Sequence, residues 1–357
     1  ALGAALLPGS AGVDLDDPEA VVHVEVGPGH AHFFRDVAQG PGGLPLGVEG
    51  RAVALVSGGF DSAVAAWQLL RRGVALDYVF CNLGGRTHQL GALRVMKHVA
   101  DHWSYGTRPR FHAVDFDAVS GDLQRSSTPR YWQVVLKRLM LRAAELVAAE
   151  RNGAAIVTGE AIGQVSSQTL QNLAVISRGC ALPILRPLVG MNKDEILATA
   201  RAIGTFELSK VVGEYCALVP SKPATAATLA AVDAEQAKLD ASMLEAAVAE
   251  RSVFDLRALD LAPLDDASLQ VDAIPAGATV LDLRSKAAYH GWHAEGALFL
   301  DFADAVRAYP SFDRGQRYAL YCEFGLKSAH LAELMRAAGF DAVSVRGGAG
   351  ALRKKRA

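Results

Sequence analysis

A glycine turn between an apolar strand and a helix constrains this chain more than any other feature. The apolar run of residues 52–56 leads directly into the sequence SGGFDS at 57–62, and a helical pattern begins near Ser62. Gly58 and Gly59 permit a tight turn whose backbone N–H groups point at an anion, and the positive end of the following helix adds to that field. The sequence therefore predicts a phosphate site. This turn has neither Gly-Lys-Ser/Thr nor Gly-x-Gly-x-x-Gly, so a Walker NTPase and a Rossmann dehydrogenase lose their basis.

Around this turn, apolar runs alternate with helical periodicity, which predicts a parallel sheet with crossover helices. The pattern extends from residue 51 to about residue 204. Asn192 and Glu195 form an expected capping box at the start of the last helix. The expected strands are 52–56, 77–82, 110–115 and 154–158, and the expected helices are 62–72, 87–103, 131–151, 167–176 and 193–203.

The rest of the 357 residues predicts further parts, as expected at about 100–200 residues per domain. One or two strands, at 21–26 and 31–34, cannot form a domain alone. The Ala-rich stretch 225–251 favours a helical connector. A second α/β pattern follows, with strands at 279–283, 317–321 and 342–345 and a helix at 328–338.

Composition excludes several classes of protein. The chain has 36 Lys and Arg against 38 Asp and Glu, so a nucleic-acid partner would need a local basic patch. A hydrophobic content of 51% argues against disorder. No apolar run reaches the roughly 18 residues of a membrane helix. The first residues lack a basic region and an initiating Met, which argues against a secretory signal and suggests a trimmed chain.

The four cysteines, Cys81, Cys180, Cys216 and Cys322, are too few and too widely spaced for a disulfide scaffold or a zinc ribbon. A reducing cytoplasm is the expected compartment, and no metal cluster is expected. Cys322 differs from an ordinary core cysteine because it follows a strand and opens the loop CEFGLKS. Backbone N–H groups and the N-terminus of the next helix would stabilise its thiolate.

Several segments together resemble the tRNA 4-thiouridine synthetase family, also called tRNA sulfurtransferases, of the thiamine and thiouridine pathway. The SGGFDS turn itself resembles the PP-loop of ATP pyrophosphatases. The segments that carry the family resemblance are SGGFDSAVA (57–65), NLGG (82–85) with His88, TGEAIGQVSSQT (158–169), LRPL (185–188) and EYC (214–216). Asp282-Leu283-Arg284, His293 with Gly296-Ala297, and the Cys322 loop resemble a rhodanese domain.

The resemblance implies an α/β fold class with two parallel-sheet domains. Residues 1–49 would be the remnant of a THUMP domain with its linker, in an N-terminally truncated chain. Residues 50–222 would be the PP-loop ATP-binding domain, 223–262 the helical connector, and 263–357 the rhodanese domain.

The resemblance also implies the site. Ser57, Gly58, Gly59 and Ser62 would hold the pyrophosphate of ATP, and Asp61 would place Mg²⁺ or the nucleotide. Lys137, an isolated charge on an apolar helix, would face the α-phosphate. Leu55, Val56, Gly159 and Gln168 would also contact ATP.

The implied activity is that of a tRNA uracil 4-sulfurtransferase. ATP would adenylate O4 of a uridine in tRNA, and sulfur from a Cys322 persulfide would displace AMP, either directly or as released sulfide. Cys216 would then form a disulfide with Cys322. Lys327 stands where many rhodaneses carry Arg, which favours a protein persulfide over thiosulfate as the sulfur source.

The implied partners are tRNA, a cysteine desulfurase as sulfur donor, the sulfur carrier protein of thiamine synthesis and a second copy in a homodimer; no membrane partner is expected. With most of a THUMP domain absent, the basic residues left for tRNA phosphates are Arg108, Arg110, Arg125, Arg130, Arg138 and 353–356. Two alternatives stay open. One is a PP-loop enzyme that adenylates and thiolates a small molecule or a carrier protein, and the other is a non-catalytic sulfur carrier or RNA-binding remnant.

Overall fold

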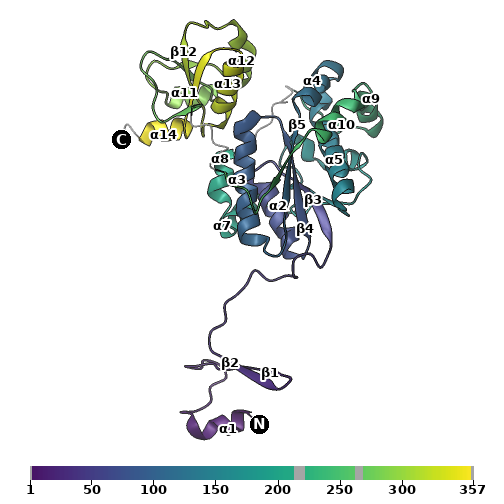
Figure 1. Ribbon diagram of the computed structural model, residues 1–357, viewed down its shortest axis with the longest axis vertical. Helices are drawn as coiled ribbons and strands as arrows, with labels where there is room; N and C mark the ends of the chain where they lie inside the picture. The colour runs from purple at the N-terminus through teal and green to yellow at the C-terminus, as the bar shows by residue number, and fades with distance from the viewer. Residues whose placement is uncertain (1, 213–221, 262–267, 355–357) are drawn as a thin grey trace. The chain divides into compact units, whose positions relative to one another are not determined.

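The computed structural model describes residues 2–212, 222–261 and 268–354 (Figure 1). The chain divides into two units, residues 1–43 and 44–357. In the first, strands β1 (His23–Gly27) and β2 (His30–Phe34) form an antiparallel hairpin, preceded by the short helix α1 (Leu2–Leu6) and a 3₁₀ turn (Leu7–Gly9). The two strands predicted here are confirmed.

The second unit begins with a six-stranded sheet in the order β7-β6-β3-β4-β5-β8. Its strands are parallel except β8, which pairs antiparallel with β5. The four predicted strands are confirmed, with ends shifted by at most two residues, and β7 and β8 were not predicted. The bounds are β3 (Arg51–Leu55), β4 (Ala75–Asn82), β5 (Arg110–Asp115), β6 (Ile156–Val157), β7 (Ile184–Leu185) and β8 (Ser252–Asp255).

Helices bury both faces of this sheet, which explains why its strands are nearly continuous apolar runs. Along β3, Ala52 and Ala54 join one apolar core and Val53 joins the other. The first core includes α2 (Phe60–Arg71), α3 (Gly85–Trp103), α7 (Lys193–Ala202) and α8 (Phe206–Val212). The second includes α4 (Asp117–Ser126), α5 (Trp132–Arg151) and α6 (Leu170–Ser177), and 3₁₀ turns precede α5 (Pro129–Tyr131) and α6 (Ser166–Gln168). The five predicted helices are confirmed, as is the capping box at α7.

The stretch predicted as a helical connector contains two helices, α9 (Leu229–Gln236) and α10 (Ala241–Ala249), followed by β8. Val232 on α9, and Leu244 and Val248 on α10, are buried in the second core of the first sheet. This segment is therefore packed onto the sheet, and its last part joins the edge of that sheet.

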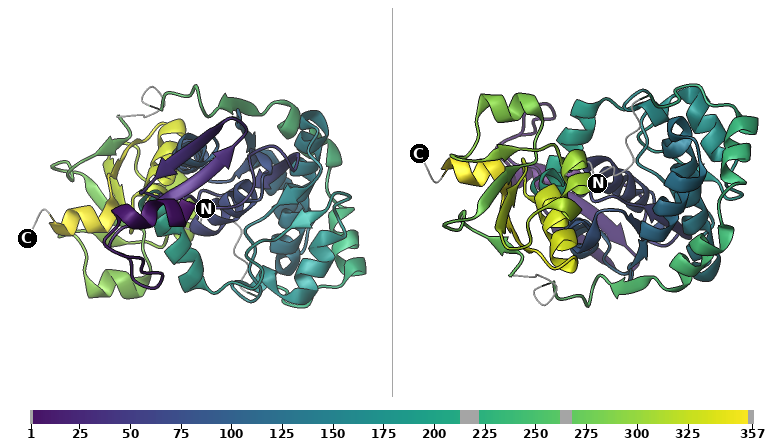
Figure 2. Two further views of the ribbon diagram at one scale, coloured as in Figure 1. Left: turned by 90° about the horizontal axis from the view of Figure 1, so that it is seen from below. Right: turned by 90° about the horizontal axis from the view of Figure 1, so that it is seen from above.

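The C-terminal part contains a five-stranded parallel sheet in the order β11-β10-β12-β13-β9 (Figures 1 and 2). The predicted strands and the predicted helix are confirmed. The strands are β9 (Gln270–Val271), β10 (Thr279–Asp282), β11 (Leu298–Phe299), β12 (Arg317–Tyr321) and β13 (Asp341–Val345). The helices are α11 (Lys286–Gly291), α12 (Phe302–Ala308), α13 (Leu326–Ala337) and α14 (Gly348–Lys354), with a 3₁₀ turn at Tyr309–Ser311.

Candidate active site

A cavity of about 360 Å³ lies at the carboxyl ends of β3, β4 and β6. The carboxyl edge of a parallel sheet is where open α/β folds bind nucleotides. Eight of the predicted site residues line this cavity: Leu55, Val56, Ser57, Asp61, Ser62, Lys137, Gly159 and Gln168. The structure thus brings together residues from three separate segments of the sequence, 55–62, the helix that contains Lys137, and 158–169.

The turn after β3 has the geometry expected of a phosphate loop. Gly58 has a φ of +80°, and a Cβ there would lie 2.8 Å from Cα of Ala92, so a larger residue would clash with α3. The Ser57 N–H donates to Ser62 Oγ at 3.3 Å, and Ser62 Oγ donates to the Gly59 carbonyl at 3.1 Å. Gly59 is the N-cap of α2 and contributes no side-chain hydrogen bond. The helix N-terminus is therefore available to an anion.

Asp61 is held by two side chains from other segments. Its Oδ1 lies 2.8 Å from Nζ of Lys193, and Gln164 Nε2 donates to Oδ2 at 2.9 Å. Sequence reasoning missed both partners. In the sequence, Lys193 stands at the first position of an ordinary capped helix, and nothing there indicates a contact with Asp61. Gln164 lies within the 158–169 segment but was not predicted as a site residue. The pair places a cation beside the phosphate turn.

Lys137 belongs to a second cluster in the cavity, centred on Glu160. Glu160 Oε1 accepts from Lys137 Nζ at 2.8 Å, Oε2 accepts from Arg186 Nε at 2.8 Å, and Thr158 Oγ1 donates to Oε2 at 3.1 Å. Burial opposes ionisation of Glu160, but Lys137 and Arg186 outweigh it and hold its pKa below the ordinary value. Glu160 and Arg186 were quoted within family-like segments but not predicted as site residues.

The cavity wall also shows why particular residue types occur at two predicted positions. A Cβ at Gly159 would lie 2.7 Å from the carbonyl carbon of Asp61. Glycine at this position therefore allows the loop after β6 to contact the first turn of α2. Gln168 is buried, and its Oε1 has no hydrogen-bond partner among the described residues. A buried acceptor without a partner fits a ligand that donates a hydrogen bond, as the amino group of adenine does. Burial lowers the pKa of His88, another lining residue, to about 4.

Cys322 lies at the start of a loop between β12 and α13. Its Sγ accepts hydrogen bonds from the Gly325 N–H at 3.2 Å and from Ser328 Oγ at 3.5 Å. Gly325 has a φ of +96°, which lets the loop curl around the sulfur, and it is also the N-cap of α13. One backbone N–H and one hydroxyl therefore face the sulfur, where several backbone N–H groups were predicted.

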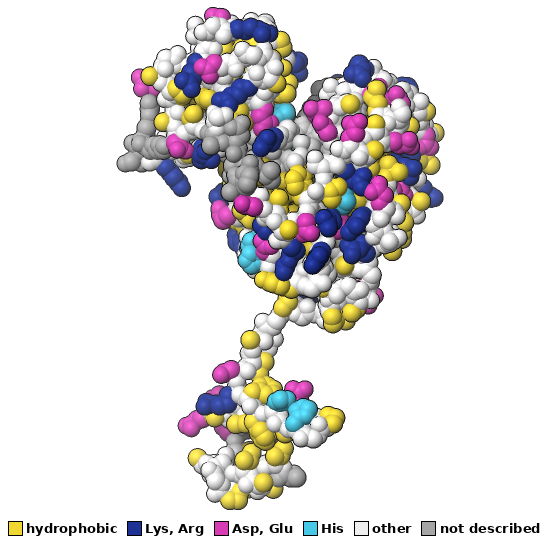
Figure 3. Space-filling model, viewed as in Figure 1, with side chains coloured by type: hydrophobic (Ala, Val, Ile, Leu, Met, Phe, Trp, Pro, Cys, Tyr) yellow, Lys and Arg dark blue, Asp and Glu magenta, His cyan; other side chains and the backbone are white. Residues whose placement is uncertain are grey.

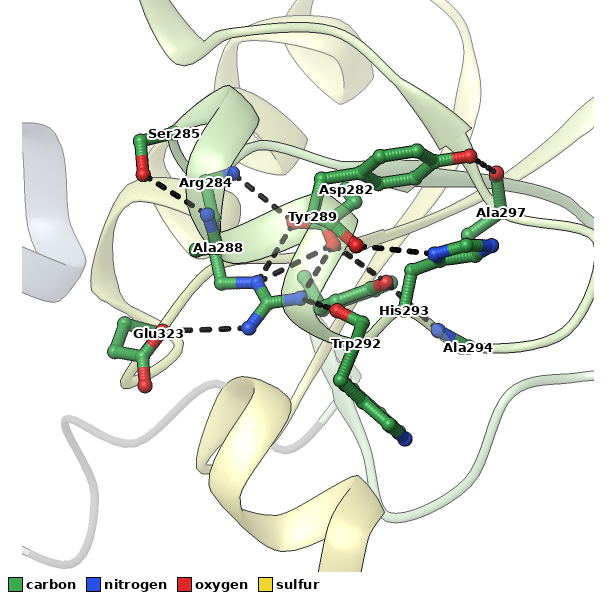
Figure 4. Close-up of polar contacts among 11 residues, drawn as sticks. Asp282, Arg284, Ser285, Ala288, Tyr289, Trp292, His293, Ala294, Ala297 and Glu323 are labelled. Carbon is green, nitrogen blue, oxygen red and sulfur yellow. Dashed lines mark hydrogen bonds and ion pairs between the residues drawn. The ribbon is translucent and has the colours of Figure 1, made fainter.

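A buried ion pair supports this loop (Figure 4). Arg284 donates to Asp282, with Nη2 at 2.7 Å from Oδ2, and the hydroxyl of Tyr321 donates to the same oxygen at 2.7 Å. Hydrogen bonding to Asp282 raises the pKa of Arg284. The other terminal nitrogen of Arg284, Nη1, lies 3.5 Å from Oε2 of Glu323, the residue after Cys322. The predicted Asp282-Leu283-Arg284 motif thus reaches the cysteine loop through Glu323.

Cys81 and Cys180 are held as ordinary thiols. Burial raises the pKa of the Cys81 thiol, and burial with the neighbouring Glu145 raises that of Cys180 to about 11, so both are held as thiols at neutral pH. Cys216 lies outside the described residues, so its predicted disulfide with Cys322 stays a prediction.

Three of the basic residues considered for tRNA contacts, Arg110, Arg125 and Arg138, have carboxylate partners in the protein. Arg138 is buried and bonded to Asp233, an arrangement typical of a structural residue, and its predicted phosphate contact stays a prediction. Arg110 pairs with Asp255, and Arg125 lies 3.8 Å from Asp122. On the face in Figure 3, Lys and Arg side chains are interspersed with Asp and Glu. Within the described ranges there is no cluster of three or more His, Cys, Asp or Glu that could hold a metal, and no helix suited to span a membrane.

These features define a class: an enzyme with an ATP pyrophosphatase-type PP-loop domain and a C-terminal rhodanese domain. Sequence comparison supports both halves. A family model described as thiamine biosynthesis protein (ThiI) matches residues 47–241, and a rhodanese-like domain model matches residues 265–355.

Comparison with individual proteins gives the family. The tRNA sulfurtransferase of Pyrobaculum aerophilum is 40% identical over 347 residues, covering 97% of this chain and 72% of that protein. That of Thermoplasma acidophilum is 37% identical over 343 residues, covering 96% of this chain and 69% of that protein. A solved 4-thiouridine synthetase–RNA complex with bound ATP is 35% identical, with a TM-score of 0.64, over 71% of this chain and 68% of that chain. This chain belongs to the tRNA sulfurtransferase family, and the predicted family and fold class are confirmed.

Proposed function

We propose that the cavity adenylates O4 of a uridine in tRNA and that a persulfide on Cys322 supplies the sulfur of 4-thiouridine. The observation that carries the proposal is the pairing of a phosphate turn, with Asp61 and Lys193 beside it, and a separate cysteine loop in one chain. An activation site alone would have no sulfur, and a sulfur carrier alone would have no use for the phosphate turn. The RNA and ATP bound by the related 4-thiouridine synthetase support tRNA and ATP as its ligands.

ATP is proposed to bind with its pyrophosphate on the turn formed by Ser57, Gly58, Gly59 and Ser62. The Ser57 and Gly59 N–H groups bond within the turn, so the Gly58 N–H and the N-terminus of α2 are the proposed donors, without a charged side chain. Lys137 and Lys193 add positive charge at the α-phosphate and at the turn. Their carboxylate partners hold both lysines in place before the nucleotide arrives.

Mg²⁺ is proposed to enter with the phosphates of ATP, with Asp61 as its protein carboxylate. Mg²⁺ is commonly held by one or two carboxylates together with substrate phosphates. Lys193 occupies Asp61 at 2.8 Å, so the metal would take a carboxylate lone pair that Lys193 and Gln164 leave open. Leu55, Val56, Gly159 and Gln168 are proposed to enclose the adenosine.

The chemistry divides between the two domains. Uridine O4 attacks the α-phosphorus, pyrophosphate leaves, and C4 then carries AMP as its leaving group. If the terminal persulfide sulfur attacks C4, AMP leaves, and the Cys216 thiolate attacks the Cys322 sulfur to free 4-thiouridine. If Cys216 instead attacks the persulfide first, hydrosulfide is released and displaces AMP. Both routes end with one Cys216–Cys322 disulfide, which a dithiol reductant must reduce by two electrons.

This cycle implies partners that the chain does not contain. A cysteine desulfurase is proposed to load Cys322, and the sulfur carrier protein of thiamine synthesis is a second proposed acceptor. A reducing cytoplasm suits a cycle that ends in a disulfide. A homodimer is proposed as the assembly.

The test is a reconstituted reaction with the full chain, ATP, Mg²⁺, unmodified tRNA, cysteine and a cysteine desulfurase. We expect pyrophosphate release together with 4-thiouridine in the tRNA. Cys322→Ala should abolish 4-thiouridine and leave tRNA-dependent pyrophosphate release unchanged, since that cysteine takes no part in adenylation. Cys180→Ala is the matched control and should behave as wild type. Loss of pyrophosphate release in Cys322→Ala would refute the assignment of adenylation and sulfur delivery to separate domains. Pyrophosphate release that occurs with a small-molecule acceptor but not with tRNA would show that tRNA is not the substrate.

A further inference from the structure

The N-terminus of helix α3 is capped by a residue far away in the sequence. Its own N-cap, Gly84, provides no side-chain hydrogen bond, and its first turn contains no acidic residue. Glu333 on α13 accepts hydrogen bonds from the N–H groups of Arg86 and Thr87, both at 3.1 Å, and from the Thr87 hydroxyl at 2.7 Å. A carboxylate in this place satisfies unpaired helix donors and opposes the positive end of the helix.

The capping contact is part of a close approach between α3 and α13 (Figure 1). Gly85 has a φ of +71°, and a Cβ there would lie 2.6 Å from Nδ1 of His330 and would also clash with Glu333. Leu326, the first residue of α13, is buried in the apolar core that α2 and α3 form with the first sheet. The rhodanese helix is therefore anchored by an apolar residue at its start and a carboxylate about two turns further along.

Both partners of this contact continue directly into the two candidate sites. The α13 helix starts at the end of the loop that surrounds the Cys322 sulfur. On the other side, Leu83, two residues before α3, and His88 near its start line the cavity. A rigid connection between the two helices therefore sets where the cysteine loop lies with respect to the cavity.

We propose that Glu333 is a positioning residue for sulfur delivery: by capping α3 it docks the Cys322 domain on the cavity wall in the arrangement used for transfer. This inference rests on the proposed function. Glu333 forms no covalent bond and moves no proton. Without the Glu333 contact, the Cys322 domain would dissociate more often from α3. This would lower the effective concentration of the persulfide at the activated uridine. Adenylation and persulfide loading need no such dock.

The test compares Glu333→Ala and Glu333→Gln with a control, Asp304→Asn, in the full chain. Asp304 is an exposed carboxylate of the same domain that pairs with Arg307, three residues further along the chain. Hydrogen exchange should show the Arg86 and Thr87 amides about tenfold less protected in Glu333→Ala, with Glu333→Gln in between, as loss of a charge-assisted hydrogen bond predicts. The control should match wild type.

The activity measurement separates docking from folding. In a single turnover of persulfide-loaded enzyme on tRNA, Glu333→Ala should form 4-thiouridine about tenfold more slowly, a loss set by effective concentration. Pyrophosphate release and persulfide loading should stay within about twofold of wild type, since Glu333 touches neither reacting centre.

Three outcomes would count against the proposal. Equal exchange in wild type and Glu333→Ala would show that Glu333 does not cap α3, and altered exchange with unchanged thiolation would show that the cap does not serve delivery. A wild-type chain that makes no 4-thiouridine would overturn the proposed function and the delivery role with it, while the exchange result would still report on the cap.

Discussion

Replacing Glu160 by Gln should destabilise the PP-loop domain at neutral pH, because it leaves two cations without their carboxylate. Glu160 is buried and holds Lys137 and Arg186, each at 2.8 Å. Removing one member of a buried ion pair costs about 3–5 kcal/mol. The Lys137 and Arg186 side chains keep 25% and 15% of their surface exposed, so water compensates part of the loss. We therefore expect the free energy of unfolding to fall by about 3 kcal/mol, the lower end of that range.

The pH dependence of this loss follows from the lowered pKa of Glu160. Its ordinary pKa is 4.5, and the folded-state pKa lies below that because Lys137 and Arg186 outweigh the opposing effect of burial. The stabilisation is therefore complete above about pH 4.5 and disappears as the pH falls through the folded-state pKa. Glu160→Gln and wild type should differ fully at pH 7 and converge at lower pH.

Urea denaturation at pH 7, 5 and 3.5, followed by circular dichroism, measures these differences. Glu245→Gln on α10 is the matched control, since Glu245 is exposed and should lose no more than a few tenths of a kcal/mol. A loss below about 1 kcal/mol at pH 7 would refute the buried-pair argument, because it would lie in the range of exposed pairs. A loss that is equal at all three pH values would show that charge is not its cause.

Three further predictions concern the turn, the cavity wall and the cysteine domain. Lys193→Ala should reduce pyrophosphate release about 100-fold, as loss of an electrostatic contact in the transition state does, with little change in melting temperature; unchanged release would exclude a role for its pair with Asp61. Gly159→Ala forces a Cβ against the backbone of Asp61, so it should lower the free energy of unfolding by about 1–3 kcal/mol and weaken ATP binding in calorimetry. An ATP affinity equal to that of wild type would show that the backbone around residue 159 can move to accommodate the Cβ. Asp282→Asn removes the buried carboxylate of Arg284 and leaves it with the exposed Glu323, so it should cost about 3 kcal/mol in thermal unfolding; a cost under about 1 kcal/mol would contradict this.

Local patterns accounted for most of the fold because most of the predicted helices have a clear helical period and the predicted strands lie in continuous apolar runs. The strands of the first sheet are buried on both faces, which produces apolar runs that sequence alone can locate. The two strands of that sheet that were missed are short or lie at an edge. β7 has only Ile184 and Leu185, and β8 forms on the far edge against β5, where exposed Val253 carries little pattern.

The candidate sites were likewise predicted where they depend on residues within one short stretch of the chain. The phosphate turn at 57–62 and the loop that begins at Cys322 were predicted because each depends on glycines and polar groups within one short stretch of chain. Gly159 and Gln168 were predicted from the family resemblance of the 158–169 segment. The structure shows a close backbone approach at Gly159 and a buried Gln168 acceptor that has no partner among the described residues.

By itself the sequence determined which segments turn and which are buried, and it located the glycine turn at 57–62 and the loop that begins at Cys322, because these properties arise from neighbouring residues. Only the tertiary structure decided which charges meet. Asp61 pairs with Lys193 across 132 residues, Glu160 joins Lys137 to Arg186, and Glu333 caps α3 from 246 residues away. Such pairs depend on how helices pack on the sheet, and a local sequence pattern does not record the partner of a charge across that distance.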